Sequence, residues 1–311
     1  MHINRRNFIK TTSSAGSLLL LSPLAGLPQV VGENKIPAAG GFKLLFLAPY
    51  WGFSGSYDQF CAASKKAGYD GVEVLWQDGD HFQKELFAAL KQYNLEVGFL
   101  CRGDETDAAA QLKTFKKHVH DAITNAFQKP IYINCHSGRD FFSYADNKPF
   151  IDFTIIEEKE TGVPIYHETH RGRSLYAAHV TRSFIETIPG LKLTFDVSHW
   201  CNVHESMLED QAETVQLALP RVEHIHSRIG HEESPQISDP RAPEWARAVN
   251  IHLAWWDKVI ERKKIKGERM TIMTEFGPPS YMPTLPYTNL PIANQWEINV
   301  YMMQLLKKRY L

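Results

Sequence analysis

The feature that most constrains the fold is a regular alternation of short apolar runs with longer amphipathic segments from residue 42 onward. Each short run has seven or eight mostly apolar residues rich in β-branched and aromatic side chains, which is typical of parallel strands buried on both faces. The predicted strands are residues 42–49, 70–76, 95–101, 130–136, 163–170, 191–197, 222–228 and 270–276. Apolar residues at helical spacing predict helices at residues 56–68, 105–127, 174–190, 244–264 and 293–311.

Eight repeats of strand and helix predict a (β/α)8 TIM barrel of the α/β class, formed as a single domain by residues 40–311. Such barrels typically take about 250 residues. A doubly wound open sheet is the alternative fold. That fold ordinarily has a glycine-rich phosphate-binding turn after its first strand, and the segment LAPYWGFSGS (47–56) does not match the G-x-G-x-x-G pattern.

Residues 1–39 are predicted to lie outside the barrel, as an export signal followed by a linker. The segment NRRNFIK (4–10) precedes the apolar stretch 14–28, an order and length typical of signal peptides. The paired Arg5 and Arg6 resemble a twin-arginine signal. An ordinary secretory signal, or a basic N-terminus without an export role, is the alternative. The apolar stretch is too short for a stable membrane anchor, so we expect an exported, periplasmic protein.

The charge balance limits the kind of partner that the protein binds. The 311 residues carry a formal net charge of −1, and residues 1–39 hold four basic side chains and one acid, so the predicted barrel carries −4. Nucleic acid requires a basic surface and is not expected as the main partner. We expect a small-molecule carbohydrate instead. The sequence does not fix the oligomeric state, and a homo-oligomer is compatible with it.

Acidic and histidine side chains lie at the carboxyl ends of the predicted strands, which is where (β/α)8 barrels carry their chemistry. Four of them, Glu168, Asp196, His226 and Glu275, follow mostly apolar stretches on four consecutive strands. Consecutive strands are neighbours in a barrel, so these side chains are expected to meet. The strand ends also contribute, in chain order, Glu73, His136, His170, His199 and Arg228.

The four consecutive side chains are predicted to bind a divalent metal ion. Buried carboxylates at close range repel one another by several kcal/mol, and a cation removes this conflict. Three carboxylates and one imidazole form a hard, oxygen-rich set of ligands that suits Mn²⁺, Co²⁺ or Mg²⁺, with Zn²⁺ also compatible. A structural zinc site would be expected to have thiolate ligands, and the four cysteines of this chain form no C-x-x-C pair.

Residues 42–309 resemble the xylose isomerase-like barrel superfamily of sugar isomerases and epimerases, particularly the ketose 3-epimerases. Single motifs are weak, but their order and spacing together are fairly specific. The motifs that carry the resemblance are AGYDGVEV (67–74), ETHRGR (168–173), FDVSHW (195–200), HIHSR (224–228) and TEFGP (274–278).

The resemblance implies a role for each strand-end residue. The four residues of the predicted site would bind the metal, and Glu168 and Glu275 would also be the catalytic acid and base on opposite faces of the substrate. His199 and Arg228 match positions that commonly contact substrate. Aromatic faces suit the C–H face of a sugar ring. Further candidates for the substrate site are His136, His170, Arg171 and Trp51, with Phe53 and Trp200 near its mouth.

The expected reaction is proton abstraction next to a carbonyl group. A divalent ion that chelates a carbonyl oxygen and the neighbouring hydroxyl acidifies the C–H between them, and a carboxylate removes the proton to give an enediolate. Return of the proton from the other face gives an epimer, and return to the adjacent carbon gives an isomer. Sugar phosphates are scarce outside the cytoplasm, so a non-phosphorylated sugar is the expected substrate.

Two other functions fit the same motifs. A leaving group placed β to the carbanion would make the enzyme a lyase that eliminates the aglycone from 3-keto-glycosides, with His170 or His199 as the base. A non-catalytic sugar-binding barrel is the third function. The endonuclease branch of the superfamily requires a basic groove, which the acidic barrel does not favour.

Two long proline-containing segments follow the last two predicted strands, at residues 231–245 and 277–294. Stiff loops beside the mouth of a barrel are expected to enclose the site and limit the size of the substrate. Packing against a partner subunit is the alternative role of these loops.

Overall fold

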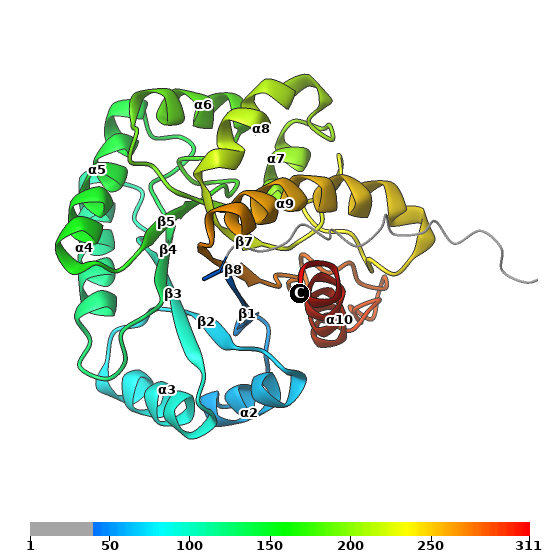
Figure 1. The fold of residues 1–311 in the computed structure, drawn as a ribbon, viewed down its shortest axis with the longest axis horizontal. Helices are drawn as coiled ribbons and strands as arrows, with labels where there is room; N and C mark the ends of the chain where they lie inside the picture. Colours follow the sequence, from blue (N-terminus) through cyan, green and yellow to red (C-terminus); the bar gives the residue numbers. More distant parts are fainter. Residues whose placement is uncertain (1–39) are drawn as a thin grey trace, which may run out of the picture. The chain divides into compact units, whose positions relative to one another are not determined.

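The computed structural model describes residues 40–311, which form a closed barrel of eight parallel strands surrounded by helices (Figure 1). The strands follow one another around the barrel in chain order, and the last pairs with the first. This arrangement confirms the predicted (β/α)8 TIM barrel. The predicted export signal lies outside the described residues. The strands are β1 (Lys43–Pro49), β2 (Gly71–Leu75), β3 (Glu96–Arg102), β4 (Tyr132–His136), β5 (Ile165–Glu168), β6 (Leu193–Phe195), β7 (Val222–His226) and β8 (Arg269–Met273).

Helices connect the strands and form the outer layer of the barrel (Figure 1). Side chains cap the start of several helices and satisfy backbone N–H groups that have no partner within the helix. Ser56 forms a capping box with Gln59, and Ser143 accepts from the backbone of Asp146. The helices are α2 (Tyr57–Ala67), α3 (Asp80–Tyr93), α4 (Ala108–Thr124), α5 (Tyr144–Thr161), α6 (Ala178–Thr187), α7 (Val197–Val203), α8 (Ala212–Ala218), α9 (Ala246–Lys266) and α10 (Gln295–Tyr310).

Five strands, β2 and β5 to β8, end one to three residues earlier than the sequence pattern predicts, and after β5 and β6 hydrogen bonds turn the chain at the carboxyl end of the barrel. After β5 the backbone N–H of His170 donates to the carbonyl of Glu168 at 2.9 Å, which starts a tight turn. After β6 the side chain of Asp196 accepts from the backbone N–H of Ser198 at 3.2 Å and caps α7. The predicted site residues therefore stand at the strand ends, as with Glu168 and His226, or just beyond them, as with Asp196 and Glu275.

The barrel interior is apolar near the amino ends of the strands and polar near their carboxyl ends. The apolar floor is formed by buried side chains such as Leu45, Tyr132 and Tyr166, which lie near the starts of β1, β4 and β5. The larger apolar core lies between the strands and the helices. Above the floor, the interior holds buried side chains such as Glu73 and Asn134. Apolar packing therefore supports a polar site at one end.

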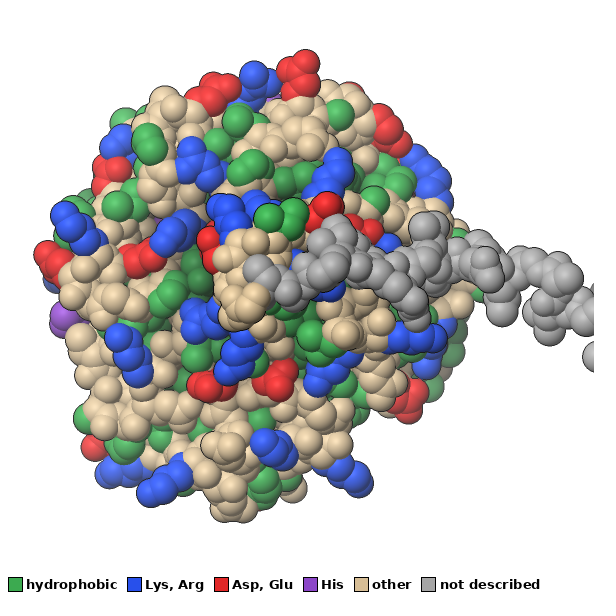
Figure 2. All heavy atoms as spheres, in the orientation of Figure 1, with side chains coloured by type: hydrophobic (Ala, Val, Ile, Leu, Met, Phe, Trp, Pro, Cys, Tyr) green, Lys and Arg blue, Asp and Glu red, His purple; other side chains and the backbone are tan. Residues whose placement is uncertain are grey.

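The outer surface of the barrel carries both signs of charge. Basic and acidic side chains are scattered over the face drawn in Figure 2. Within residues 40–311, no helix combines the length and apolar character that a membrane crossing needs.

Candidate metal centre and active site

The structure brings the four predicted metal ligands together at the carboxyl ends of four neighbouring strands. One ligand atom from each of Glu168, Asp196, His226 and Glu275 lies within 4.8 Å of the others. The exposed fractions of these residues are 2%, 0%, 1% and 9%. Three carboxyl groups in so small and buried a space repel one another unless positive charge compensates them.

Neighbouring segments hold Glu275 at the edge of this cluster. One residue separates Glu275 from the end of β8. The residue after Glu275, Phe276, donates its backbone N–H to the side chain of Asn299 on α10 at 2.8 Å. Gly277 exchanges two hydrogen bonds with the side-chain amide of Gln236. The backbone beside Glu275 is therefore tied to α10 and to the loop after β7.

The donor atoms of the cluster fit a hard divalent cation. Among the described residues, buried Oε1 of Glu168 and Nδ1 of His226 find no hydrogen-bond partner. His226 Nδ1 is 2.8 Å from Glu275 Oε2 and 3.4 Å from Glu168 Oε2, yet neither contact is aligned as a hydrogen bond. Buried polar atoms without partners are rare unless a ligand uses them. Oxygen-rich donors with one imidazole suit Mn²⁺, Mg²⁺ or Co²⁺.

Arg228 supplies positive charge beside the same carboxylates. Its Nη2 atom contacts Asp196 Oδ2 and lies 3.3 Å from Glu275 Oε2 and 2.8 Å from His199 Nε2. The ring of Tyr281 covers the guanidinium at 4.6 Å. Burial lowers the pKa of Arg228, but the two carboxylates raise it more, so the pKa lies above its usual value.

The carboxyl groups differ in their affinity for protons. Burial raises the pKa of Asp196 to about 7, because it outweighs the opposing effect of Arg228, and the nearby Glu275 and Glu168 raise it further. Burial also raises the pKa of Glu168, but His136 and His226 lower it more, so this pKa lies well below its usual value. Carboxyl groups with pKa values pushed apart are typical of sites that transfer protons.

A cavity of about 500 Å³ opens beside the cluster, at the carboxyl ends of the strands. Four of the predicted substrate contacts line it, namely Trp51, His136, His170 and Arg228, together with Glu275. The remaining two predicted contacts, His199 and Arg171, do not line the cavity.

The three histidines at the cavity stack against one another. The ring centroids of His136 and His170 are 4.4 Å apart, and those of His170 and His199 are 4.0 Å apart. Burial lowers the pKa of His170 and of His199 well below the usual value, so both rings are neutral. His199 is fully buried behind His170. His136 Nε2 lies 2.9 Å from Glu168 Oε2 and joins the stack to the cluster.

The barrel is similar to several solved structures at low sequence identity. A probable 3-DHS dehydratase involved in petrobactin synthesis, from Bacillus anthracis, has a TM-score of 0.55 and 15% identity, covering 85% of this chain and 99% of that chain. A D-tagatose 3-epimerase-like protein has a TM-score of 0.54 and 13% identity, covering 85% and 97%. A xylose isomerase domain protein from Alicyclobacillus acidocaldarius subsp. acidocaldarius has a TM-score of 0.51 and 14% identity, covering 86% and 98%. The chain has the xylose isomerase-like barrel fold.

The classification as a xylose isomerase-like barrel rests on the fold. The sequence matches no protein-family model and no curated protein. The resemblance inferred from the strand-end motifs is therefore confirmed for the fold, and the role of each residue stays a prediction.

Arg171 and Trp200 take positions other than those predicted. Arg171 donates to the side chain of Asn202 at 3.1 Å and lies over the ring of Tyr281 at 5.1 Å, outside the cavity wall. Trp200 is fully buried and donates to the carbonyl of Leu175 at 3.0 Å, so it belongs to the core and not to the mouth of the site. The sequence holds no signal that separates an aromatic residue in the core, such as Trp200, from one at the mouth of the site.

Several cavity residues were not predicted. Tyr281 comes from the loop 277–294, so this loop contributes one residue to the cavity wall. The loop 231–245 contributes no residue to the cavity wall and instead supports Gly277 through Gln236. Arg102 and Arg173 also line the cavity. Both follow strand ends in the sequence, which is the signal that could have found them.

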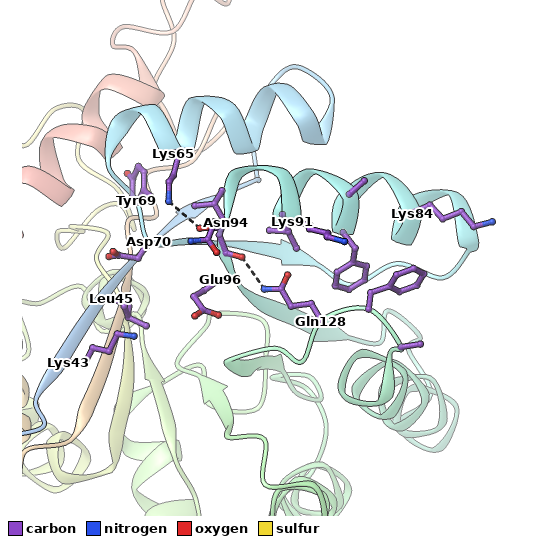
Figure 3. Close-up of a pocket in the computed structure, with 16 residues that line it drawn as sticks. Lys43, Leu45, Lys65, Tyr69, Asp70, Lys84, Lys91, Asn94, Glu96 and Gln128 are labelled. Atoms are coloured by element: carbon purple, nitrogen blue, oxygen red, sulfur yellow. Dashed lines mark hydrogen bonds between the residues drawn. The ribbon is translucent and has the colours of Figure 1, made fainter.

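A larger cavity, of about 860 Å³, lies at the opposite end of the barrel (Figure 3). It is formed where β1 to β3 begin and α2 and α3 end, and exposed lysines such as Lys65 and Lys91 line it. Lys65 donates to the backbone carbonyl of Asn94 at 3.2 Å, and the acids Asp70 and Glu96 stand among the lysines. These charges are reached by solvent, so their position requires no ligand.

Proposed function

We propose that the protein is a metal-dependent sugar isomerase or epimerase that abstracts a proton next to a carbonyl group of a non-phosphorylated sugar. The observation that carries the proposal is the buried cluster of Glu168, Asp196, His226 and Glu275 beside the cavity. A divalent ion held by these four residues would polarise a carbonyl oxygen and acidify the adjacent C–H. The low-identity likeness to a D-tagatose 3-epimerase-like protein agrees with this reaction.

The residues of the cluster divide the proton transfer between them. Glu168 has a pKa well below its usual value and is ionised, so it is ready to accept a proton. Glu275 lies in the cavity wall, whereas Glu168 stands behind it, 2.9 Å from Nε2 of the wall residue His136. We assign these two glutamates to opposite faces of the sugar. Arg228 and His136 line the same wall and can bind substrate oxygens.

The ion pairs around the cavity favour an uncharged substrate. Arg173 Nη2 lies 3.5 Å from Asp104 Oδ1, and Arg102 Nε lies 3.1 Å from Asp104 Oδ2. Arg228 is paired with the acids of the cluster. A phosphate or carboxylate would have to compete with protein carboxylates for each of these cations. A neutral sugar makes no such demand.

A lyase that eliminates the aglycone from 3-keto-glycosides is the second candidate. An apolar part of the cavity wall, formed by Phe53, Leu75 and Leu100, suits an aglycone. His170 Nδ1 faces the carbonyl oxygen of Arg171, which only accepts, so the neutral ring keeps a lone pair on Nε2. The low-identity likeness to a probable 3-DHS dehydratase agrees with an elimination.

Solvent exchange distinguishes these functions. The Mn²⁺-loaded protein is incubated in deuterated water with free ketoses and, separately, with 3-keto-glycosides. The proposed function predicts deuterium at the carbon next to the carbonyl of a ketose, together with an epimer or isomer. Release of aglycone without any change in the ketoses would support the lyase. Binding of sugars without exchange would support a non-catalytic sugar-binding barrel.

We propose export by the twin-arginine route as the location of this activity. The support is the Arg5–Arg6 pair and the apolar stretch that follows it. Replacement of both arginines by lysine is expected to keep the protein in the cytoplasmic fraction, as judged by cell fractionation. Unchanged export of this variant would favour an ordinary secretory signal.

A further inference from the structure

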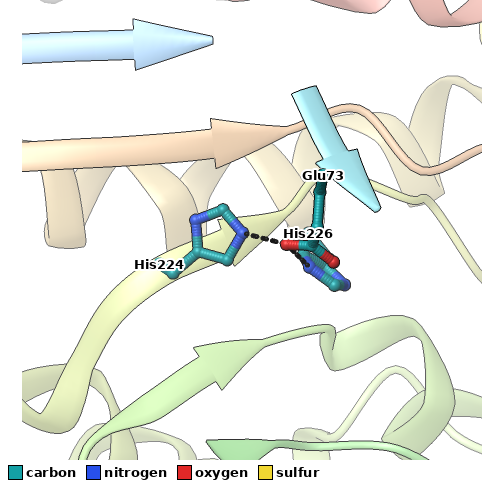
Figure 4. Close-up of side chains that lie close together, drawn as sticks. All are labelled: Glu73, His224 and His226. Atoms are coloured by element: carbon teal, nitrogen blue, oxygen red, sulfur yellow. Dashed lines mark hydrogen bonds and ion pairs between the residues drawn. The ribbon is translucent and has the colours of Figure 1, made fainter. Parts of the chain in front are cut away.

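Glu73 lies on β2 and faces both histidines of β7 (Figure 4). Its Oε2 atom is 3.4 Å from His226 Nε2 and 3.5 Å from His224 Nε2. Tyr132 donates a hydrogen bond to the same oxygen at 2.7 Å. Only 5% of Glu73 is exposed. A charge this deep in a barrel is costly unless donors hold it, so its partners indicate what it does.

The hydrogen atoms of Asn134 decide how His226 is hydrogen-bonded. The amide nitrogen of Asn134 is 2.8 Å from Glu168 Oε2, 3.4 Å from Glu73 Oε1 and 3.3 Å from His226 Nε2. This nitrogen carries two hydrogens, and carboxylate oxygens accept only. Both hydrogens therefore go to the two carboxylates. His226 Nε2 is left to donate its own hydrogen to Glu73.

This assignment leaves Nδ1 of His226 facing the carboxylate cluster. Nδ1 lies 2.8 Å from Glu275 Oε2 and has no hydrogen-bond partner within residues 40–311. The ring thus has one nitrogen bonded to Glu73 and the other directed at the proposed metal ligands.

His224 does not share this arrangement. Its Nδ1 atom is 3.0 Å from the carbonyl oxygen of Thr271, which only accepts, so Nδ1 carries the hydrogen. Its Nε2 atom, which faces Glu73, has no hydrogen-bond partner in the described part of the chain. The directed hydrogen bond of Glu73 is therefore the one to His226.

We propose that Glu73 is a positioning residue that fixes the ring of His226, with Nδ1 directed at Glu168 and Glu275 as a metal ligand. The inference rests on the metal site of the proposed function. Histidine ligands commonly donate their second N–H to a carboxylate, which fixes the tautomer and the ring orientation and makes the ligand more basic.

Glu73 is ionised in this position. Tyr132 donates to its Oε2 atom at 2.7 Å and Asn134 to its Oε1 atom at 3.4 Å, and such donors favour the charged form of a carboxyl group. An ionised acceptor forms a stronger hydrogen bond than a neutral one. The charge and the acceptor oxygen of Glu73 can therefore be tested separately.

The test measures Mn²⁺ affinity by electron paramagnetic resonance, which detects the free aqueous ion. Glu73→Leu removes the acceptor, and Glu73→Gln keeps an acceptor oxygen without the charge. Glu157→Leu is the matched control, because Glu157 is 7% exposed and pairs with His120 Nδ1 at 2.9 Å on the helices outside the barrel. We expect Glu73→Leu to weaken Mn²⁺ binding about 10–100-fold, Glu73→Gln to weaken it less, and Glu157→Leu to leave it unchanged.

A second measurement reports on the geometry of the site. The visible absorption spectrum of the Co²⁺-loaded protein is expected to change in Glu73→Gln and not in the control. If Glu73→Leu does not fold, Glu73→Gln carries the test through both measurements.

The outcomes separate this inference from the proposed function. Mn²⁺ affinity within twofold of wild type in both Glu73 variants, with binding lost in His226→Ala, would overturn only the role of Glu73. A wild-type chain that binds no Mn²⁺ would overturn both. Metal binding that depends on Glu73, without any proton exchange in sugars, would overturn only the proposed reaction.

Discussion

At the amino ends of β1 to β3 the barrel has a cavity of about 860 Å³, and at the carboxyl ends of its strands it has one of about 500 Å³. The larger cavity is lined by exposed lysines and by Asp70 and Glu96, which solvent reaches. The smaller one adjoins carboxylates that are nearly or fully buried, and some of their atoms have no partner among the described residues. Charges screened by water require nothing further, whereas buried charges require compensation. Burial of charge, and not volume, is therefore the reason why we propose the carboxyl end as the functional one.

The largest expected difference is in kcat, between variants at the two ends of the barrel. Glu168→Gln should lower kcat by about 10²–10⁴-fold, because the side chain loses its ability to accept a proton while keeping an oxygen for the metal. Glu96→Gln, in the larger cavity, should leave kcat unchanged. Both variants are measured by steady-state kinetics on the sugar found in the deuterium experiment. An equal loss in both variants would remove the distinction between the ends.

The next largest effect is on stability. Arg228→Met should lower the free energy of unfolding by about 3–5 kcal/mol, because it leaves the buried Asp196 and Glu275 without their cation. Lys65→Met, at the opposite end, should change it by less than about 0.5 kcal/mol, as expected for an exposed side chain. Urea unfolding at pH 8 in the presence of a chelator measures both. Similar stability of the two variants would mean that Arg228 does not compensate the cluster.

A metal ion should stabilise the protein through the carboxyl end alone. Mn²⁺ at 100 times its dissociation constant should raise the free energy of unfolding by about 2.7 kcal/mol. This gain should vanish in Asp196→Asn and persist in Glu96→Gln. Urea unfolding with and without Mn²⁺ provides the measurement. A gain that survives Asp196→Asn would place the ion elsewhere.

A smaller effect, on the change of the free energy of unfolding with pH, comes from buried histidines that belong to neither cavity. Burial lowers the pKa of His167 to about 3 and that of His252 to about 4, from an ordinary value of 6.5. Folding thus favours the neutral rings, so their contribution is fully present above pH 6.5 and is lost as the pH falls toward 4. Each ring should lower the free energy of unfolding by about 1.4 kcal/mol for every pH unit of acidification in this window.

Urea unfolding between pH 7.5 and 4.5 checks this slope. The measurement uses the Asp196→Asn background, because the raised pKa of Asp196 acts in the opposite direction. His252→Gln should make the slope shallower. An unchanged slope would show that His252 does not contribute.

The sequence was sufficient to predict the barrel and the composition of the cluster. Eight apolar runs of strand length leave few alternatives, and ligands at the carboxyl ends of consecutive strands must converge in a closed barrel. The positions of Glu168, Asp196, His226 and Glu275 follow from this topology alone. The helices α3, α5, α7 and α8 were missed; α7 and α8 have only seven residues each, and α5 has a weakly amphipathic sequence that contains Pro149.

The roles of several other site residues, among them Glu73 at a predicted strand end, could not be assigned from the sequence, because these roles depend on side-chain direction. Arg171 and Arg173 are two positions apart, yet Arg173 lines the cavity and Arg171 does not. Asn134 and Glu73 lie within strands and contact the site through the barrel interior. Tyr281 reaches the cavity through a long loop whose path no local pattern specifies.

The proposed function depends most directly on whether the buried cluster binds a divalent ion. Equilibrium dialysis of the purified protein against Mn²⁺, followed by elemental analysis, measures this stoichiometry. We predict one Mn²⁺ per chain in the wild type and in Glu96→Gln, and none in a double variant with Glu168→Ala and His226→Ala. A wild-type chain that retains no Mn²⁺, or a double variant that retains as much as the wild type, would contradict the account.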